Sequence, residues 1–239
     1  MKPWLSTFFG KGEKRILSLT DAQQQALAAW RELPVPDANA SHQATRYVVA
    51  DVETSGLNME KDHLISIGAV AVVNGMIDSR DAFEVVLRQD EVSSHANILI
   101  HGIGGAAQRE GLDPADALLE FLAYAGKSPL VAYHALFDQT VIARAMFEHL
   151  DLRFKPTWVD LALVAPDLFR EVTTECGNLD DWLQQFGIEN IQRHNALSDA
   201  YATAQLLQVV IARAAHRDAG SPASFLRLQK SRHWMHGAH

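Results

Sequence analysis

The chain of 239 residues has almost no cysteine, and its single one, Cys176, cannot form an intrachain disulfide. It also lacks long apolar runs: the longest, residues 64–73, is far shorter than the roughly 20 residues of a membrane-spanning helix. The apolar patch near the N-terminus is too short for a secretory signal core of roughly 7–15 residues. We therefore expect a cytoplasmic protein without a membrane segment, since a reducing compartment fits the absence of disulfides.

Basic residues are also scarce relative to acidic ones, with 21 Lys and Arg against 29 Asp and Glu and a formal net charge of −8. Proteins that follow long nucleic acids through phosphate contacts usually carry a basic surface, so this balance argues against a processive, duplex-tracking protein. It is compatible with an enzyme that holds a few nucleotides at one end, because clustered carboxylates bind cations and those cations can contact phosphate.

Apolar patterning divides the chain into an extension, a main domain and a tail. Residues 1–44 are expected to form an N-terminal extension with one helix at 21–33, which two prolines follow. The main domain is expected at 45–216, and a length of this order suits one domain with a substantial core. Residues 217–239 are expected to form a C-terminal tail with one short helix at 224–229.

The main domain begins with apolar runs typical of strands and continues with helical periodicity. Asn74-Gly75 lies between two of these runs and predicts a hairpin. The remaining elements are expected as strands at residues 47–52, 64–73, 76–87 and 130–133, and as helices at 114–125, 136–150, 158–169, 179–186 and 195–215. This order predicts an α/β fold with a mixed sheet flanked by helices.

Two acidic residues, Asp51 and Glu53, lie at the end of the apolar strand expected at 47–52. Residues two apart in a strand point to the same side, so these carboxylates are expected to lie close together. Their charges repel, and burial increases that repulsion. Hard cations, which prefer oxygen ligands, would neutralise the pair. The two residues alone fit a solvent-facing acidic strand end equally well.

Three further polar residues lie near the start of expected helices. Asp138 opens one helix, and Asp199 lies off the apolar stripe of another, where it can face a cleft. His194 precedes Asp199 by five residues, so the two cannot share one helical face, and we expect His194 in the loop before the helix with Asn195 as its cap. Each residue alone fits an ordinary structural role. Together with Asp51 and Glu53 they indicate a site beyond the strand ends.

These residues fall into three segments, which are Asp51-Val52-Glu53-Thr54-Ser55-Gly56-Leu57, Tyr133-His134-Ala135-Leu136-Phe137-Asp138 and His194-Asn195-Ala196-Leu197-Ser198-Asp199. The segments resemble the three motifs of the DEDDh exonuclease family, which includes the proofreading subunit of bacterial replicative DNA polymerase, RNase T and oligoribonuclease. The third matches the family pattern H-x-A-x-x-D, and the resemblance extends over residues 46–212. It implies an RNase H-like fold with a mixed five-stranded sheet.

The second segment departs from the family pattern. The family usually has His-Asn before Ala-x-Phe-Asp, whereas this chain has Tyr133-His134, so that His134 occupies the usual Asn position. We expect this change to alter local polar contacts and substrate preference while leaving Asp138 in place.

The resemblance implies hydrolysis with two divalent cations, Mg²⁺ or Mn²⁺. Asp51 is then expected to bridge both ions, and Glu53 and Asp199 to bind mainly the ion that activates water. Asp138 is expected to reach the metals directly or through water, and His194 to accept the proton, since its ordinary pKa lies near working pH. The expected substrate-binding residues are Thr54 near the terminal sugar, Leu57 against the base, and His101, His134 and Phe137 along the same pocket.

The function implied by the resemblance is 3′→5′ hydrolysis at the end of single-stranded DNA, with release of 5′-mononucleotides, in DNA repair or proofreading. RNA ends or short oligonucleotides are an alternative, because recognition of the 2′-hydroxyl depends on the shape of the pocket. A polymerase-associated binding subunit is a second alternative, which the complete catalytic set disfavours. A phosphoesterase of free nucleotides is a third, which the segments at Leu57 and His101 disfavour by resemblance. A polymerase is the candidate protein partner, and the oligomeric state is left open.

Overall fold

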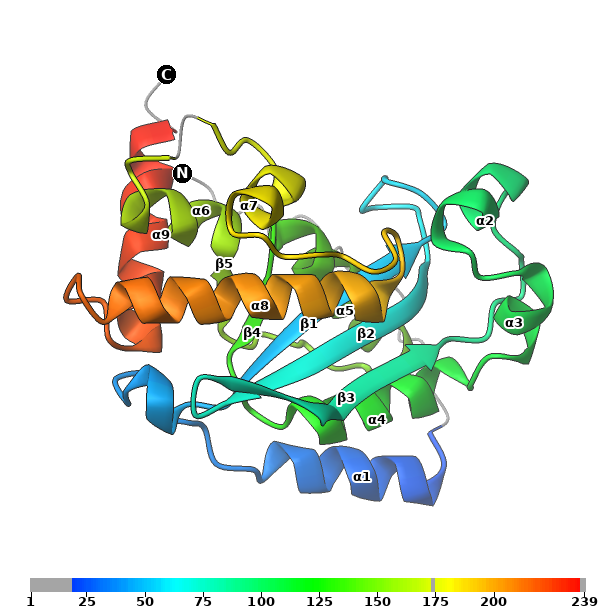
Figure 1. Ribbon diagram of the computed structural model, residues 1–239. Helices are drawn as coiled ribbons and strands as arrows, with labels where there is room; N and C mark the ends of the chain where they lie inside the picture. Colours follow the sequence, from blue (N-terminus) through cyan, green and yellow to red (C-terminus); the bar gives the residue numbers. More distant parts are fainter. Residues whose placement is uncertain (1–18, 173–174, 237–239) are drawn as a thin grey trace.

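The computed structural model describes residues 19–172 and 175–236, and within them five strands form one mixed sheet (Figure 1). Its order is β3-β2-β1-β4-β5. The strands are β1 (Tyr47–Thr54), β2 (Leu64–Val73), β3 (Met76–Val86), β4 (Leu130–Ala132) and β5 (Trp158–Asp160). β2 pairs antiparallel with both β1 and β3, whereas β1, β4 and β5 run parallel to one another. The expected α/β class with a mixed five-stranded sheet is confirmed.

Helices cover both faces of this sheet, and the alternation of side chains along β1 shows how. Val48, Ala50 and Val52 join a buried cluster on the face covered by α4 (Pro114–Ala125) and α5 (Leu136–Leu150). Tyr47 and Val49 join the cluster on the opposite face, together with buried residues of the remaining large helices. Those helices are α6 (Leu161–Leu168), α7 (Leu179–Gln185), α8 (Ala196–Ala214) and α9 (Pro222–His236).

The N-terminal part of the described chain packs on the α4 side. α1 (Asp21–Arg31) lies within the expected range, and Thr20 forms a capping box with Gln23 at its start. Trp30 Nε1 donates to the carbonyl of Gly126, 2.8 Å away, which joins α1 to the end of α4. Residues 1–18 lie outside the described part, and the boundaries of the expected extension and tail remain predictions.

The turn between β2 and β3 confirms the expected hairpin. Asn74 and Gly75 both have positive φ, at 54° and 71°, and Val73 pairs with Met76 across the turn. Positive φ at both central residues is the conformation that Asn-Gly sequences favour in two-residue hairpins. Two short helices, α2 (His95–His101) and α3 (Gly105–Glu110), follow β3 before the chain enters α4.

Two sequence predictions of helices need correction. Residues 158–169 were expected to form one helix, but Trp158–Asp160 form the edge strand β5, and α6 begins at Leu161. The helix begins there because the Asp160 side chain accepts a hydrogen bond from the backbone of Ala162 and caps it. The helix expected at 224–229 is longer, since α9 spans Pro222–His236 and packs against β5 and α6. No helix in the described residues is long and apolar enough to span a membrane.

A glycine in β2 brings α8 close to the sheet. Gly68 pairs with Asp51 of β1. A Cβ atom on Gly68 would lie 2.2 Å from the backbone nitrogen of Leu197 and 2.3 Å from the carbonyl carbon of Ala196. The first turn of α8 therefore rests on the sheet where β2 has no side chain, and this contact places Asp199 over β1.

We expect Gly68→Ala to lower the free energy of unfolding by about 1–3 kcal/mol, because the added methyl group has to displace helix backbone. The measurement is urea denaturation followed by circular dichroism. The matched control is Gly220→Ala, since a Cβ at Gly220 has no atom within 4 Å. Equal stability of the two variants would contradict the close approach of α8.

Candidate metal centre and active site

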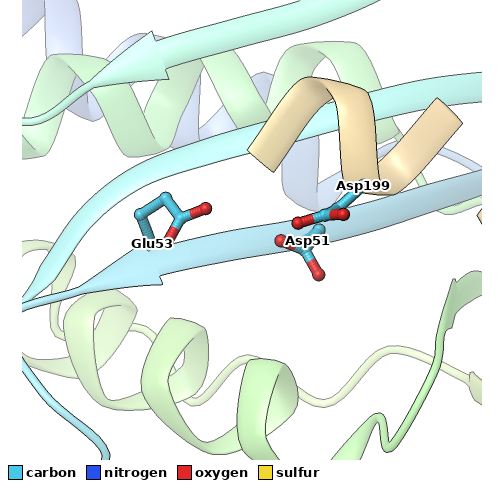
Figure 2. A group of neighbouring side chains, drawn as sticks. All are labelled: Asp51, Glu53 and Asp199. Carbon is cyan, nitrogen blue, oxygen red and sulfur yellow. The ribbon is translucent and has the colours of Figure 1, made fainter. Parts of the chain in front are cut away.

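Three carboxylates meet between β1 and α8. Asp51 and Glu53 come from β1 and Asp199 comes from the first turn of α8, as Figure 2 shows. Each offers one oxygen to a group whose members all lie within 4.8 Å of one another. Such a group of oxygen ligands matches the preference of hard divalent cations. The pair expected on β1 and the distant acid expected on the last helix of the domain are thus brought together.

The geometry of β1 explains why Asp51 and Glu53 face α8. They continue the series of Tyr47 and Val49, which point to the α8 side of the sheet. The pairing of β1 with β2 shifts its register between Glu53 and Thr54, so β1 leaves the regular ladder just beyond the two acids. The apolar strand therefore ends in two charged side chains that point to one face.

Asp199 is fixed by the loop that precedes α8. The backbone N–H of His194 donates to Asp199 Oδ2 at 2.9 Å, and Arg193 Nη1 donates to Oδ1 at 2.9 Å. Asn190 Nδ2 donates to the same Oδ1. Arg193 also forms an ion pair with Asp180 of α7 at 3.0 Å. No sequence pattern marks Asn190 or Arg193, because only the folding of this loop onto α8 brings them to the carboxylate.

Asp138 lies in the first turn of α5 and is 4% exposed. Burial, followed by the charges of Asp160 and Glu53, raises its pKa to about 8, although backbone hydrogen bonds act in the opposite direction. Asp138 also raises the pKa of Asp51 through its charge. Within the described residues the 4.8 Å group comprises Asp51, Glu53 and Asp199 without Asp138. Asp138 is thus an electrostatic neighbour of the group.

The other carboxyl groups are also held in an unfavourable setting. The pKa of Asp51 lies well above its ordinary value because of burial first, and then because of the charges of Asp138, Asp199 and Glu53. Burial and the charge of Asp199 raise the pKa of Glu53 to about 7, and Arg193 opposes both shifts. Bound cations would remove this repulsion, so the residues present fit a centre for divalent metal ions.

His194 lies in the loop before α8, as expected. Its φ is +60°, its side chain is exposed, and Asn195 caps α8 by accepting a hydrogen bond from Ser198. The structure shows that the backbone of His194 orients Asp199. Proton transfer by its imidazole remains a prediction.

The residues expected to bind substrate lie in different surroundings. Leu57 is 89% exposed, and Thr54 Oγ1 donates to the carbonyl of Gly56 at 2.6 Å. Phe137 is partly buried against the α4–α5 cluster, and His134 is exposed. Contact of these four residues with substrate remains a prediction.

His101 differs from the other expected substrate residues because it is only 4% exposed. Its Nδ1 accepts a hydrogen bond from Ile103 at 3.0 Å, and its Nε2 lies 3.3 Å from Ser93 Oγ. The structure thus shows that His101 braces the α2 segment, while substrate contact by this residue also stays a prediction.

Comparison with known proteins agrees with this site. The sequence model of the RNase T exonuclease family matches residues 48–207, which include all four carboxylates and His194. The chain belongs to this exonuclease family. The predicted DEDDh resemblance is therefore confirmed. The PolC-type DNA polymerase III of Bacillus subtilis is 31% identical over 183 residues, which are 75% of this chain and 12% of the polymerase. The match thus spans about an eighth of that relative's length.

Solved structures show the same fold. Exonuclease I of E. coli in complex with a dT13 oligonucleotide superposes with a TM-score of 0.59 and 18% identity, over 72% of this chain and 42% of that one. The nuclease domain of 3′hExo, a DEDDh family member bound to rAMP, gives a TM-score of 0.61 with 14% identity, over 72% and 94% of the two chains. At these identities the likeness establishes the fold.

The raised pKa values predict how the stability of the folded chain depends on pH. Folded Glu53 and Asp138 retain protons up to pH values of about 7 and 8, whereas the unfolded chain releases them near pH 4 to 5. The stability that these two groups contribute is therefore fully present below the unfolded pKa values and is lost as the pH rises through the folded ones. In EDTA, we expect the free energy of unfolding to fall between about pH 5 and 8. With Mn²⁺ in place of EDTA, we expect a smaller fall, because an ion that binds only the folded chain stabilises it.

Two variants test the origin of this pH dependence: one removes a carboxylate of the site, and its control removes a carboxylate of the surface. Asp51→Asn is expected to flatten the pH profile in EDTA, while Glu120→Gln, on the exposed surface of α4, leaves it unchanged. Urea denaturation at a series of pH values measures both. Identical profiles of the two variants would show that repulsion within the carboxylate group is absent.

Proposed function

We propose that this exonuclease removes nucleotides from the 3′ end of single-stranded DNA and releases 5′-mononucleotides. The observation that carries the proposal is the convergence of Asp51, Glu53 and Asp199 within 4.8 Å, beside the buried Asp138. Four carboxylates in one place are destabilising for the protein alone. They are suited to cations that hold a phosphodiester, which is itself anionic.

Two divalent cations, Mg²⁺ or Mn²⁺, are the proposed cofactors. Asp51 is the proposed bridging ligand, because it interacts electrostatically with all three other carboxylates. Glu53 and Asp199 would hold the cations together with Asp51, and Asp138 would contribute its carboxylate from the first turn of α5. When bound, such a pair of cations lowers the pKa of water and stabilises the charge that develops on the attacking and leaving oxygens.

His194 is the proposed general base. Its loop position is fixed through its own backbone bond to Asp199 at 2.9 Å, while its side chain stays exposed. An exposed imidazole on this loop can take a proton from the attacking water and pass it to solvent. The hydrogen bond from the backbone of His194 to Asp199 therefore holds the proposed base and a proposed metal ligand next to each other.

The end of the substrate is proposed to lie beside the loop that follows β1. Leu57, at 89% exposure, offers an apolar surface for the terminal base, and Thr54 lies near the proposed sugar position. Phe137, His134 and the segment braced by His101 would complete the pocket. The exposure of Leu57 favours this role over core packing, because a leucine of the core would be buried.

The choice between DNA and RNA rests on comparisons alone. The complex of exonuclease I with dT13 favours DNA. The second candidate substrate is an RNA end, and the rAMP bound to the nuclease domain of 3′hExo favours it. The PolC-type relatives make a polymerase the candidate partner, with repair or proofreading as the setting.

The test is cleavage of 5′-labelled single-stranded DNA and of matched RNA, with Mg²⁺, Mn²⁺ or EDTA. We expect a ladder that shortens from the 3′ end, runs faster on DNA, and disappears in EDTA and in Asp51→Ala. His194→Ala is expected to lower the rate by about 10²–10⁴-fold with little change in metal affinity, as for loss of a general base.

Each alternative gives a different result in this assay. Faster cleavage of RNA would assign the enzyme to RNA ends. Shortening from the 5′ end, or activity retained by a folded Asp51→Ala variant, would contradict the proposed mechanism. Equal loss of rate and of metal binding in His194→Ala would make His194 a ligand instead of the base.

A further inference from the structure

The outer edge of β5 is covered by a side chain of the C-terminal helix. β5 is the last strand of the sheet, so its outward backbone groups have no neighbouring strand. Gln229 of α9 takes that place: its Oε1 accepts from the N–H of Asp160 at 3.1 Å, and its Nε2 donates to the carbonyl of Trp158 at 3.4 Å. The side-chain amide thus pairs with β5 as a peptide group of another strand would.

The side chain of Asp160 connects β5 to the turn that leads into α5. Asp160 is 9% exposed, and its Oδ1 accepts from the backbone N–H groups of His134 and Ala162, each at 3.0 Å. The bond to Ala162 caps α6 within the same segment. The bond to His134 crosses to the neighbouring segment, between β4 and α5.

That turn depends on outside support. His134 has a φ of +60°, a left-handed conformation that few residues other than glycine adopt, although Asn, Asp and His are enriched there. The residue at the start of α5, Ala135, makes no side-chain capping bond. Asp138 follows in the first turn of the helix, so a displaced turn displaces its carboxylate. The conformational requirement also explains why His can stand where the family usually has Asn.

A second contact fixes α9 to the same region. Arg232 forms an ion pair with Asp167 of α6 at 3.0 Å, and both side chains are largely covered, with exposures of 21% and 10%. α6 begins directly after Asp160. The helix that carries Gln229 is therefore attached at two points, and it lies wholly beyond residues 48–207 that match the exonuclease family.

We propose that Asp160 is a positioning residue for Asp138, and that Gln229 positions Asp160 from the C-terminal helix. The supporting chain runs from the Gln229 amide to the backbone of Asp160, from its carboxylate to the N–H of His134, and from that turn to Asp138. Its effect on catalysis rests on the proposed function, whereas its effect on the order of the turn does not.

Three variants and one control test whether Asp160 positions Asp138 and whether Gln229 positions Asp160. Asp160→Ala removes the acceptor for His134, and Asp160→Asn retains an oxygen that can accept the same bond. Gln229→Met keeps the side-chain volume but removes both bonds to β5. The matched control is Lys230→Ala, the neighbouring exposed residue on α9. The two readouts are amide hydrogen exchange of residues 134–138, with a segment of α8 as internal reference, and kcat and KM on 5′-labelled oligonucleotide.

In Asp160→Ala, we expect exchange of residues 134–138 to become about tenfold faster while the α8 reference is unchanged. We expect kcat to fall on the order of 10–100-fold with KM within about threefold, because misplacing a reacting group mainly affects the chemical step. Asp160→Asn should keep both the exchange rate of residues 134–138 and kcat close to the wild-type values. Gln229→Met should shift both readouts in the same direction by a smaller factor, and Lys230→Ala should match the wild type.

Unchanged exchange in Asp160→Ala, or unchanged kcat in that variant, overturns the positioning role. An Asp160→Asn variant as defective as Asp160→Ala does so as well, because the hydrogen bond would then be irrelevant. If Asp160→Ala does not fold, Gln229→Met decides, and a wild-type result in both readouts overturns the proposal. A wild-type protein that cleaves neither DNA nor RNA refutes the proposed function instead, and hydrogen exchange still decides whether the turn is held.

Discussion

Repulsion among four carboxylates at one end of the sheet is the constraint on which this structure depends. Burial and neighbouring negative charge raise the pKa values of Asp51, Glu53 and Asp138, so the folded chain holds these groups where they are least stable as anions. Arg193 offsets part of this repulsion through its ion pair with Asp199. Bound divalent cations would make the arrangement favourable, and that links the instability of the site directly to its proposed chemistry.

The fold resists this repulsion by fixing the segments that carry the carboxylates. Asp51 and Glu53 both lie in the ladder that pairs β1 with β2, opposite Gly68 and Ser66, so they cannot move apart without breaking that ladder. Gly68 admits α8 to the sheet, and the loop before α8 binds Asp199. On the other side, the proposed support through Asp160 holds the start of α5. Contacts of the sheet, of the loop before α8 and of the turn before α5 thereby bring together acids from three segments.

Local patterns predicted much of this organisation. Alternation placed Asp51 and Glu53 on one side of β1, and Asn74-Gly75 predicted the hairpin, because both depend only on neighbours in sequence. Residues 158–169 were expected to form one helix, because apolar periodicity cannot distinguish a short buried strand from the helix that follows it. The cap formed by Asp160 separates the two elements, and its effect is visible only once β5 has joined the sheet.

In the candidate site, too, the motifs predicted the residues but not the contacts that hold them. The motifs indicated the four carboxylates and His194, and three of these carboxylates lie together between β1 and α8. The contacts of Asn190, Arg193 and Gln229 could not be predicted, because each depends on where a loop or helix packs after folding. Burial of His101 was likewise unpredictable from a motif that marks a residue without showing its surroundings.

The most direct test of the central claim is calorimetric titration of Mn²⁺ into the wild-type chain and the Asp51→Asn variant at a pH of about 8, which lies above the folded pKa of Glu53 of about 7. Saturable binding of two ions to the wild type, with both sites weakened in Asp51→Asn, is the expected result. Absence of saturable binding, or equal binding by the variant, would contradict the conclusion that the carboxylates are held together to bind metal.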